Sequence, residues 1–235
     1  MTNSERRGRP VAGEVKGVVV DIDGTLSDST RRVSLDAIAA LRKVNDSGVA
    51  TMLASGNVLP IAYSLATYCG FEGPIIAENG GMVCHRQKIW VLADPDLPRR
   101  AFEHLRVNMA VERLFTDRWR ETEVGIRQDT GLDDVRRILE GFEIDVQSTG
   151  WAIHIMERGM DKMVGVRKAC EIIGLSTDEV AAIGDSENDE RILTGCGWGI
   201  AVGNAPDGTK EVATYAATHE SGDGVVEALE WLRLL

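Results

Sequence analysis

The sequence reads KGVVVDIDGT at residues 16–25, a run of valines followed by two aspartates. A short, continuous run of β-branched residues is typical of a strand that is buried on both faces of a parallel sheet. Ligands of such sheets bind outside the carboxyl ends of the strands, which is where Asp21 and Asp23 would lie. This stretch therefore predicts a fold class and the position of a candidate site together.

Helices and strands alternate on both sides of a central segment. Three strands and two helices are predicted between residues 16 and 77, and the same alternation resumes after Asp161. Alternation of this kind indicates an α/β fold with a doubly wound parallel sheet, similar to the Rossmann fold. Strands are expected over residues 16–21, 49–54, 74–77, 180–183 and 200–202, and helices over 35–47, 60–68, 161–173 and 225–234, with one more ending at 193.

The alternation is interrupted after the turn Asn79-Gly80-Gly81. The segments that follow predict a hairpin, two helices and two strands of an antiparallel sheet. We therefore expect a small α+β domain, residues 83–158, inserted into a core formed by residues 16–82 and 159–235, after a disordered tail over residues 1–15. The predicted elements of the insertion are the hairpin runs 82–84 and 89–92, the helices 98–109 and 132–139, and the strands 143–147 and 151–156.

The composition narrows the classes of partner. The chain has 26 basic and 37 acidic side chains, a net charge of −11, and no long basic run, so a nucleic-acid partner is not expected. Its apolar runs are far shorter than the roughly 18–20 residues that cross a bilayer, and the N-terminal segment lacks the apolar stretch of a secretory signal. The four cysteines lie far apart, as is typical of free thiols. We expect a cytoplasmic protein without a membrane partner, either a monomer or a homodimer.

Four aspartates follow strands that are expected to end at the same edge of the sheet. Asp21 and Asp23 are two residues apart on extended backbone and point to the same side, whereas Asp185 and Asp189 can share one helix face. Carboxylates that converge in one crevice repel one another unless a cation lies among them, and oxygen ligands of this kind suit Mg²⁺. A single aspartate at a strand end is usually a cap or a turn residue, so the predicted magnesium site depends on the four together.

Two further positions indicate an anionic ligand. Lys162 begins a predicted helix, where the helix dipole disfavours a cation unless an anion is close. Ser55, followed by Gly56 and Asn57 before another helix, has the backbone N–H groups of a phosphate cradle. Taken alone, Lys162 is more simply a solvated surface residue, and Ser55 is equally well an ordinary helix cap.

These four groups, in this order along the chain, resemble the four motifs of the haloacid dehalogenase superfamily of phosphohydrolases. The resemblance spans nearly the whole chain after the tail, and it implies that the inserted segment is the superfamily's second type of cap domain. The compact cap, together with Ser-Gly-Asn in the second motif, is most similar to the archaeal phosphoglycolate phosphatases, whereas many members of the superfamily have Arg at the position of Asn57. The matching stretches are Asp21-x-Asp23-Gly24-Thr25, Ser55-Gly56-Asn57, Lys162 and Gly184-Asp185-x-x-Asn188-Asp189.

The resemblance implies a phosphatase that acts on a small phosphorylated metabolite, with 2-phosphoglycolate as the expected substrate. Asp21 is then expected to attack phosphorus and form an aspartyl-phosphate, and Asp23 to serve as general acid and base. Lys162 and Ser55 are expected to bind the phosphoryl oxygens.

The resemblance also implies the metal ligands. Mg²⁺ is expected on Asp21, Asp185 and Asp189, and on Asp23 through its backbone carbonyl. The inserted domain is expected to close over the substrate and to contact the leaving group. Four of its arginines could meet a carboxylate on the substrate, but none of them is assigned; these four are Arg113, Arg118, Arg120 and Arg127.

Three other interpretations remain open at this point. The same scaffold could serve a phosphatase of a sugar phosphate or of a phosphorylated sugar acid, or a phosphomutase. A phospho-accepting receiver domain also groups acids, Ser or Thr, and Lys around Mg²⁺, but it carries its acceptor on a later strand, whereas Asp21 ends the first. A non-catalytic phospho-binding protein of this fold would be expected to lack Asp21 or Asp23, and both are present.

Overall fold

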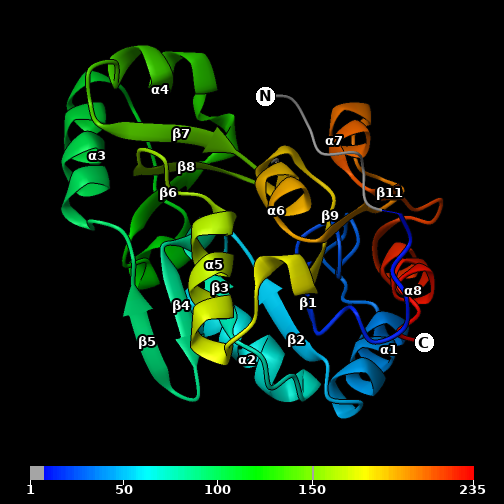
Figure 1. The fold of residues 1–235 in the computed structure, drawn as a ribbon. Coiled ribbons are helices and arrows are strands. Elements are labelled where there is room, and N and C mark those ends of the chain that lie inside the picture. The colour runs from blue at the N-terminus through cyan, green and yellow to red at the C-terminus, as the bar shows by residue number, and fades with distance from the viewer. Residues whose placement is uncertain (1–7, 150) are drawn as a thin grey trace, which may run out of the picture.

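The core of the molecule is an eight-stranded sheet in the order β11-β10-β9-β1-β2-β3-β4-β5 (Figure 1). The computed structural model describes residues 8–149 and 151–235. The central strand β1 (Gly17–Asp21) pairs in parallel with β2 (Ala50–Ala54) on one side and with β9 (Val180–Gly184) on the other. All pairings from β11 to β3 are parallel, which confirms the predicted doubly wound core. The outer strands are β3 (Ile75–Ala77), β4 (Met82–His85), β5 (Lys88–Val91), β10 (Trp198–Ala201) and β11 (Tyr215–Ala216).

Helices cover both faces of this sheet, and the alternation of β1 shows why. Val18 and Val20 pack in one apolar cluster, while Val19 packs in a second cluster on the opposite face. None of the helices in the described ranges is long and apolar enough to cross a membrane. The first face carries α1 (Leu35–Asp46), α2 (Leu59–Cys69) and α8 (Ser221–Trp231); the second carries α5 (Lys162–Ile173) and α6 (Glu190–Gly195), with α7 (Asp207–Val212) beside them.

The first helix begins where the sequence predicts it. The Ser34 hydroxyl accepts a 3.2 Å hydrogen bond from the backbone N–H of Ala37, which satisfies one of the free donors of the first turn. The helix ends before Gly48, whose φ of +93° is a conformation that glycine adopts without strain. These two local signals fix the length of α1 and so the start of β2.

The hairpin that follows the Asn79-Gly80-Gly81 turn belongs to the core. β4 pairs antiparallel with β3, and β5 pairs antiparallel with β4, so both strands extend the large sheet. Met82 and Cys84 pack in the first apolar cluster and Val83 in the second, as core strands do. The start predicted for the insertion, residue 83, therefore lies too early, because the turn reverses the chain along the sheet edge rather than leading it away.

A second sheet lies beside the core and forms what we call the inserted domain, residues 96–157. It has three antiparallel strands in the order β6-β8-β7, and its helices pack on one face around a separate apolar cluster that includes Phe102, Leu105 and Ile153 (Figure 1). The predicted α+β character is confirmed, but β6 was not predicted, because Gly125 and the charged ends of this strand hide its alternation. The elements are α3 (Asp96–Asn108), β6 (Glu123–Arg127), α4 (Leu132–Ile138), β7 (Ile144–Ser148) and β8 (Ala152–Glu157).

The two faces of this small sheet differ in chemistry. Val124 and Ile126 on β6, with Ile153 on β8, pack against the helices. Glu123 and His154, on the opposite face, are nevertheless 5% and 3% exposed, since the core covers them. The strands were predicted to be half exposed; instead, the polar face is buried at the junction with the core.

The segment before β1 is partly ordered. Arg9 donates to the backbone carbonyls of Trp231 (2.5 Å) and Glu230 (2.8 Å) in the last turn of α8, and Trp198 donates through Nε1 to the carbonyl of Gly8 (3.2 Å). The predicted disordered tail is therefore wrong for residues 8–15, because free carbonyls at a helix end attract a cation. Residues 1–7 of that predicted tail lie outside the described residues.

Short 3₁₀ turns connect several of these elements. Two of them lie at the candidate site, one after β3 and one after β9. They are η1 (Glu78–Gly80), η2 (Phe115–Trp119), η3 (Gln128–Thr130), η4 (Thr177–Glu179) and η5 (Glu187–Asp189).

Candidate active site

Three loops meet at the carboxyl edge of the core sheet, as predicted. β1 ends at Asp21, Ser55 directly follows β2, and Asp185 directly follows β9. Because β9, β1 and β2 are parallel neighbours, these ends lie side by side although they are distant in the sequence. The order of strands thus places the predicted motifs in one crevice.

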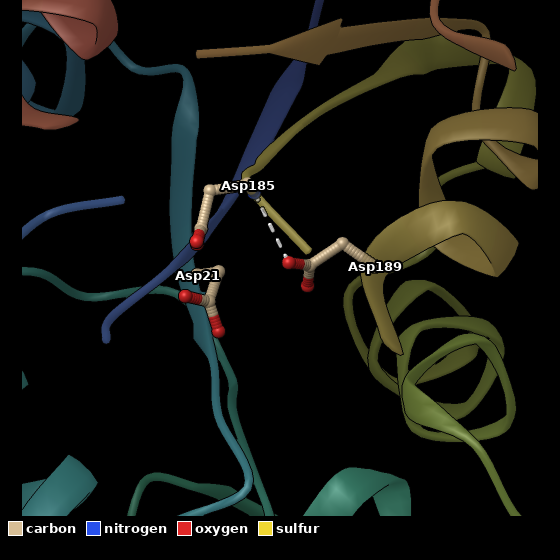
Figure 2. Close-up of side chains that lie close together, drawn as sticks. All are labelled: Asp21, Asp185 and Asp189. Atoms are coloured by element: carbon tan, nitrogen blue, oxygen red, sulfur yellow. Dashed lines mark hydrogen bonds between the residues drawn. The ribbon is translucent and has the colours of Figure 1, made fainter. Parts of the chain in front are cut away.

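Three of the four predicted aspartates form a compact group. Figure 2 shows the carboxylates of Asp21, Asp185 and Asp189 turned toward a common centre, and one oxygen of each lies within 4.8 Å of the others. Asp189 is fully buried, and its Oδ2 accepts the backbone N–H groups of Asp185 (3.2 Å) and Ser186 (3.1 Å). These bonds fix one Asp189 oxygen in the loop and leave Oδ1 facing the group.

The Asp185 carboxylate is positioned by the loop after β1. Thr25 donates a 2.7 Å hydrogen bond through Oγ1 to Asp185 Oδ1. The backbone at Gly24 has a φ of +96°, and a Cβ there would collide with the same carboxylate, so this position requires glycine. Burial, and then the negative charge of Asp189, raises the pKa of Asp185 to about 6.

Lys162 joins the group from the start of α5. Its Nζ donates to Asp21 Oδ1 at 2.5 Å and to Asp189 Oδ1 at 2.7 Å, and the residue is 1% exposed. Burial alone would lower the pKa of this ammonium, but the attraction of Asp189 and Asp21 outweighs it and raises the pKa. A solvated surface lysine is thereby excluded, since Lys162 is a buried cation that bridges two carboxylates.

The group carries more negative charge than its lysine neutralises. Three ionised carboxylates beside one ammonium leave a surplus of negative charge, so the ionised form of the carboxyl groups is disfavoured there. Burial raises the pKa of Asp21 well above its usual value; Lys162 opposes this rise, while Asp189 and Asp185 add to it. Buried carboxylate oxygens within a few ångströms of one another, with surplus charge, fit a divalent cation that prefers oxygen ligands.

Asp23 lies apart from these three carboxylates. Its Oδ2 accepts a 2.5 Å hydrogen bond from Asn57 Nδ2, and Arg31 Nη2 lies 3.3 Å from its Oδ1. The Asp23 side chain is 20% exposed and lines the same cavity as Asp21. The expectation that both aspartates point to one side is met, but only Asp21 brings its carboxylate to the group of three.

The Ser55 turn differs from an ordinary helix cap. Ser55 Oγ accepts the backbone N–H of Asn57 at 2.9 Å, whereas α2 is capped at Val58, without a side-chain hydrogen bond. Ser55 is 1% exposed, and among the described residues its hydroxyl proton has no acceptor. Asn57, at the position where related motifs often carry Arg, serves to bind Asp23.

A cavity of about 330 Å³ opens between this edge of the core and the inserted domain. Asp21 and Asp23 lie on its core side, and the opposite wall includes His154, Trp151 and Phe115 of the inserted domain. The volume is at the lower end of the range for small-molecule sites. A small ligand bound in this cavity would lie against Asp21 and Asp23.

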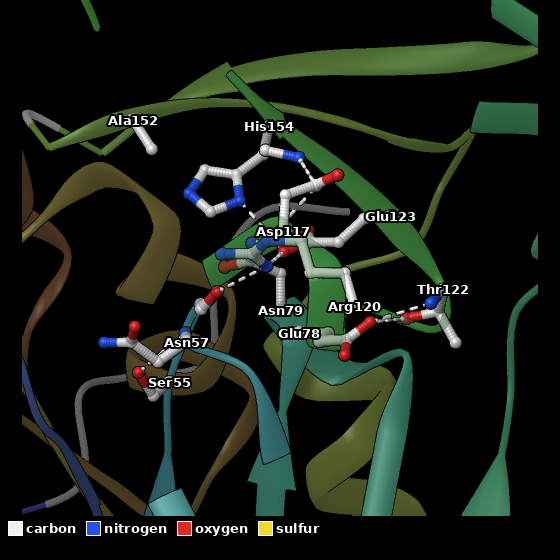
Figure 3. A network of polar contacts seen from close by, with 12 residues as sticks. Ser55, Asn57, Glu78, Asn79, Asp117, Arg120, Thr122, Glu123, Ala152 and His154 are labelled. Atoms are coloured by element: carbon white, nitrogen blue, oxygen red, sulfur yellow. Dashed lines mark hydrogen bonds and ion pairs between the residues drawn. The ribbon is translucent and has the colours of Figure 1, made fainter. Parts of the chain in front are cut away.

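A buried polar network, which the sequence did not reveal, joins the two domains (Figure 3). Arg120 donates through Nη1 to the carbonyl of Gly56 at 2.9 Å and forms an ion pair with Glu123. Asn79 on the core donates through Nδ2 to Glu123 Oε2 at 3.0 Å. A Cβ on Gly125 would lie 2.8 Å from Arg120 Nε, so this strand position must lack a side chain.

The turn after β3 is strained at this junction. Glu78 and Asn79 have φ values of +51° and +50°, in the left-handed region that favours glycine. The buried Glu78 carboxylate accepts the backbone N–H and the hydroxyl of Thr122, both at 2.7 Å. Contacts to the inserted domain therefore keep two non-glycine residues in an unfavourable conformation, as is common next to functional sites.

His154 faces the cavity from β8. Its Nδ1 lies 2.9 Å from Glu123 Oε1, and its Nε2 lies 3.2 Å from Thr149 Oγ1. Burial, and then the charge of Arg120, lowers the pKa of His154 well below its usual value, so the ring is neutral near pH 7. In the sequence, His154 alternates with the apolar residues of its strand. This pattern predicted an exposed polar face of the sheet, whereas the structure buries that face in the network.

Comparisons with known proteins agree with this geometry. A family model for haloacid dehalogenase-like hydrolases matches residues 18–113 and 128–229. The phosphoglycolate phosphatase of Methanopyrus kandleri is 37% identical over 222 residues, which cover 92% of this chain and 96% of that protein. The phosphoglycolate phosphatase of Methanothermobacter thermautotrophicus is 34% identical over 215 residues, covering 92% and 97%.

Solved structures show the same fold. The crystal structure of Thermoplasma acidophilum 0175 superimposes with a TM-score of 0.88 at 29% identity and covers 94% of this chain and 99% of that one. The structure of a haloacid dehalogenase-like hydrolase from Bacteroides thetaiotaomicron gives a TM-score of 0.77 at 24% identity, over 94% and 100% of the two chains. The chain belongs to the haloacid dehalogenase-like hydrolase family. Within that family it is a phosphatase, a hydrolase of phosphoric monoesters.

Proposed function

We propose that this phosphatase is Mg²⁺-dependent and hydrolyses 2-phosphoglycolate to glycolate and phosphate through an aspartyl-phosphate. The observation that carries the proposal is the position of Asp21, which faces a small cavity with one carboxylate oxygen bound by the buried Lys162. Among the described residues the other oxygen, Oδ2, has no hydrogen-bond partner and is free to act as a nucleophile. The relatives that cover almost the whole chain are phosphoglycolate phosphatases, which supports this choice of substrate.

In the first step Asp21 Oδ2 attacks phosphorus and the bond from phosphorus to the ester oxygen breaks. The electron pair of that bond goes to the ester oxygen, which takes the proton of the Asp23 carboxyl group and leaves as an alcohol. Asp23 lines the cavity beside Asp21, and Asn57 orients its carboxyl group through Oδ2.

In the second step water attacks phosphorus and gives its proton to the Asp23 carboxylate. The bond between phosphorus and Asp21 breaks, and its electron pair returns to the carboxylate. Phosphate leaves, Asp21 is ionised again and Asp23 is protonated again. Each aspartate ends in the state in which it began, so the cycle is complete.

Other side chains neutralise charge around phosphorus. Lys162 is placed to bind a phosphoryl oxygen, since its ammonium already lies against the nucleophile. Ser55 contributes the hydroxyl proton that has no acceptor within the described part of the chain. The expected Mg²⁺ ligands are the carboxylates of Asp21, Asp185 and Asp189 and the backbone carbonyl of Asp23; bound Mg²⁺ supplies positive charge that offsets the repulsion between a carboxylate nucleophile and a phosphate dianion.

Phosphate release from a panel of esters tests the proposal. The panel contains 2-phosphoglycolate, sugar phosphates and phosphorylated sugar acids, each with Mg²⁺ and with a chelator. We expect Mg²⁺-dependent release that is fastest on 2-phosphoglycolate and falls at least about 10³-fold in Asp21→Asn. Asp36→Asn, which removes an exposed carboxylate from α1, is the matched control and should act as wild type.

The outcomes separate the open interpretations. Faster release from a sugar phosphate would retain the mechanism and overturn the proposed substrate. Release that persists in Asp21→Asn would overturn the aspartyl-phosphate. No release from any ester would support a phospho-binding role without catalysis.

We also propose a cytoplasmic location, which is supported by four free, buried cysteines, as expected in a reducing compartment.

A further inference from the structure

The cavity wall contains a cation that the proposed reaction does not use. Arg31 lies in the loop after β1 and lines the cavity next to Asp23, with its Nη2 3.3 Å from Asp23 Oδ1. Its guanidinium carbon lies 5.6 Å from the centre of the Trp151 ring, which belongs to the opposite wall. Arg31 therefore spans the cavity edge between the core and the inserted domain.

The loop is built to present this side chain. Asp28 Oδ1 accepts the backbone N–H groups of Thr30 (2.8 Å) and Arg32 (3.0 Å), and the carbonyl of Asp28 accepts the N–H of Arg31 (2.9 Å). These bonds close a tight turn with Arg31 near its tip, at a φ of +64°. An arginine in the left-handed region is strained, and strain of this kind next to a cavity points to a functional constraint.

The other ionisable groups of the cavity do not offer a free positive charge. Apart from Asp21 and Asp23, the ionisable side chains that line it are Arg31, Arg120 and His154. Arg120 is buried and forms an ion pair with Glu123 and a hydrogen bond to the Gly56 carbonyl, which leaves its Nε as a buried donor without a hydrogen-bond partner among the described residues; His154 is neutral. Arg31 is 52% exposed, and the single ion pair with Asp23 is its one polar side-chain contact to the described residues. Among the described lining residues, Arg31 is thus the exposed cation with free donors.

We propose that Arg31 determines specificity by binding a carboxylate on the leaving group, so that the substrate class is the phosphate ester of a small 2-hydroxy acid. This inference rests on the proposed function, because Asp23 must lie within hydrogen-bond distance of the ester oxygen. In such an ester a single carbon separates the ester oxygen from the carboxyl group. An ester oxygen bound to Asp23 therefore brings that carboxyl group beside the guanidinium of Arg31.

The chemistry of the pair accounts for selectivity. A guanidinium presents parallel N–H donors that match the two oxygens of a carboxylate. Hydrogen bonds between ionised groups of this kind are stronger than those between neutral groups. A hydroxymethyl group in the same place would leave the free donors of the guanidinium without an ionised acceptor. No further carboxylate among the described lining residues competes for Arg31, since Asp21 and Asp23 are the acids of the cavity.

The test compares two esters of nearly equal size, 2-phosphoglycolate and 2-hydroxyethyl phosphate, in which a hydroxymethyl group replaces the carboxylate. The kcat and KM values of both are measured for wild type, Arg31→Gln, Arg31→Lys and Arg32→Gln. Arg32 is the matched control, because it is the neighbouring exposed arginine of the same loop and does not line the cavity. Arg31→Gln and Arg32→Gln change the net charge equally, so they separate a specific contact from general attraction of anions.

We expect Arg31→Gln to lower the preference of kcat/KM for 2-phosphoglycolate about 10- to 100-fold, mainly through a higher KM, and Arg31→Lys to restore part of it. Arg32→Gln should keep the wild-type preference. An unchanged preference in Arg31→Gln, or an equal loss in both Gln variants, would overturn this inference and leave the proposed function intact. Absence of hydrolysis by wild type would overturn the proposed function and the inference with it.

Discussion

Lys162 Nζ and Asp21 Oδ1 lie 2.5 Å apart with both side chains buried, although 141 residues separate them in the sequence. Asp189 Oδ1 lies 2.7 Å from the same nitrogen and is also buried. One ammonium therefore serves two carboxylates that would otherwise be left without a counter-charge. We predict that stability and the proposed catalysis both depend on this nitrogen atom.

Replacement of Lys162 by Met is predicted to lower the free energy of unfolding by about 3–5 kcal/mol in the absence of metal, because buried charges lose their partner. Phosphatase activity should fall at least about 10³-fold. Urea unfolding and phosphate release measure the two effects. Lys168→Met is the control on the same helix, since Lys168 pairs with Glu171 at the surface, and a change there should stay below about 1 kcal/mol. Equal unfolding of Lys162→Met and wild type would contradict the prediction.

Arg120 is predicted to stabilise the junction between the two domains. Arg120→Met leaves the Glu123 carboxylate buried without a cation and removes the bond to the Gly56 carbonyl, so the free energy of unfolding should fall by about 3–5 kcal/mol. Arg118→Met is the matched control, because Arg118 stacks on the exposed rings of Phe115 and Trp119 and should matter by less than about 1 kcal/mol.

A second measurement isolates the charge of Arg120. Because Arg120 is one of the causes of the low pKa of His154, the His154 pKa should rise in Arg120→Met, as measured by titration of the ring in NMR spectra. In Arg120→Met/Glu123→Gln the loss of stability should be smaller than the sum of the two single losses. A His154 pKa that stays as low in Arg120→Met would contradict a contribution from Arg120 and leave burial and the charge of Lys162 as its causes.

Glu227 is predicted to make stability depend on pH. Burial opposes ionisation, but hydrogen bonds from the Thr218 backbone and the Tyr215 hydroxyl lower the Glu227 pKa from 4.5 to about 2. Since the folded-state pKa is the lower one, this stabilisation is present above about pH 4.5 and is lost as the pH falls toward 2.

Glu227→Gln should therefore lower the free energy of unfolding by about 1–3 kcal/mol near pH 7, and the gap to wild type should narrow as the pH falls below about 4.5 and close near pH 2. Urea unfolding over this pH range measures the gap. Glu230→Gln, at an exposed position of the same helix, should differ little from wild type at any pH. A gap that is constant with pH would show that Glu227 acts through packing rather than through its charge.

Local sequence signals were sufficient to predict the core and its motif loops. The valines of β1, the Ser34 cap and the alternation of helices and strands are all properties of neighbouring residues. Asp21, Lys162 and Asp189 could be brought together in advance because parallel strands end at one edge of the sheet.

What the sequence could not reveal depends on contacts between distant segments. Glu123 and His154 alternate with apolar residues just as exposed residues do, and their burial arises only because the core packs over them. Arg120 was one of the four arginines of the inserted domain named as candidates for binding a carboxylate, and nothing in the sequence distinguishes it from the other three. Its partner Gly56 lies 64 residues away, and no local pattern connects the two.

The predicted limits of the domains failed for a similar reason. The composition of the hairpin after Gly81 does not indicate whether it extends the core or begins an insertion. The antiparallel pairing of β4 with β3 shows that it extends the core. The segment at residues 8–15 looks like a polar tail, but Arg9 binds carbonyls of α8 at the far end of the chain.

The place of β9 in the sheet has a consequence for synthesis of the protein. β1 is made early, yet one of its edges is covered only by β9, whose first pairing joins Gly17 to Val180. During translation that edge of β1 stays open until the whole inserted domain has left the ribosome, whereas the inserted domain has a complete apolar cluster of its own and can collapse first. The nascent chain must therefore keep an unpaired, valine-rich strand from self-association for most of its elongation, a period in which chaperone binding to residues 17–21 would be most useful.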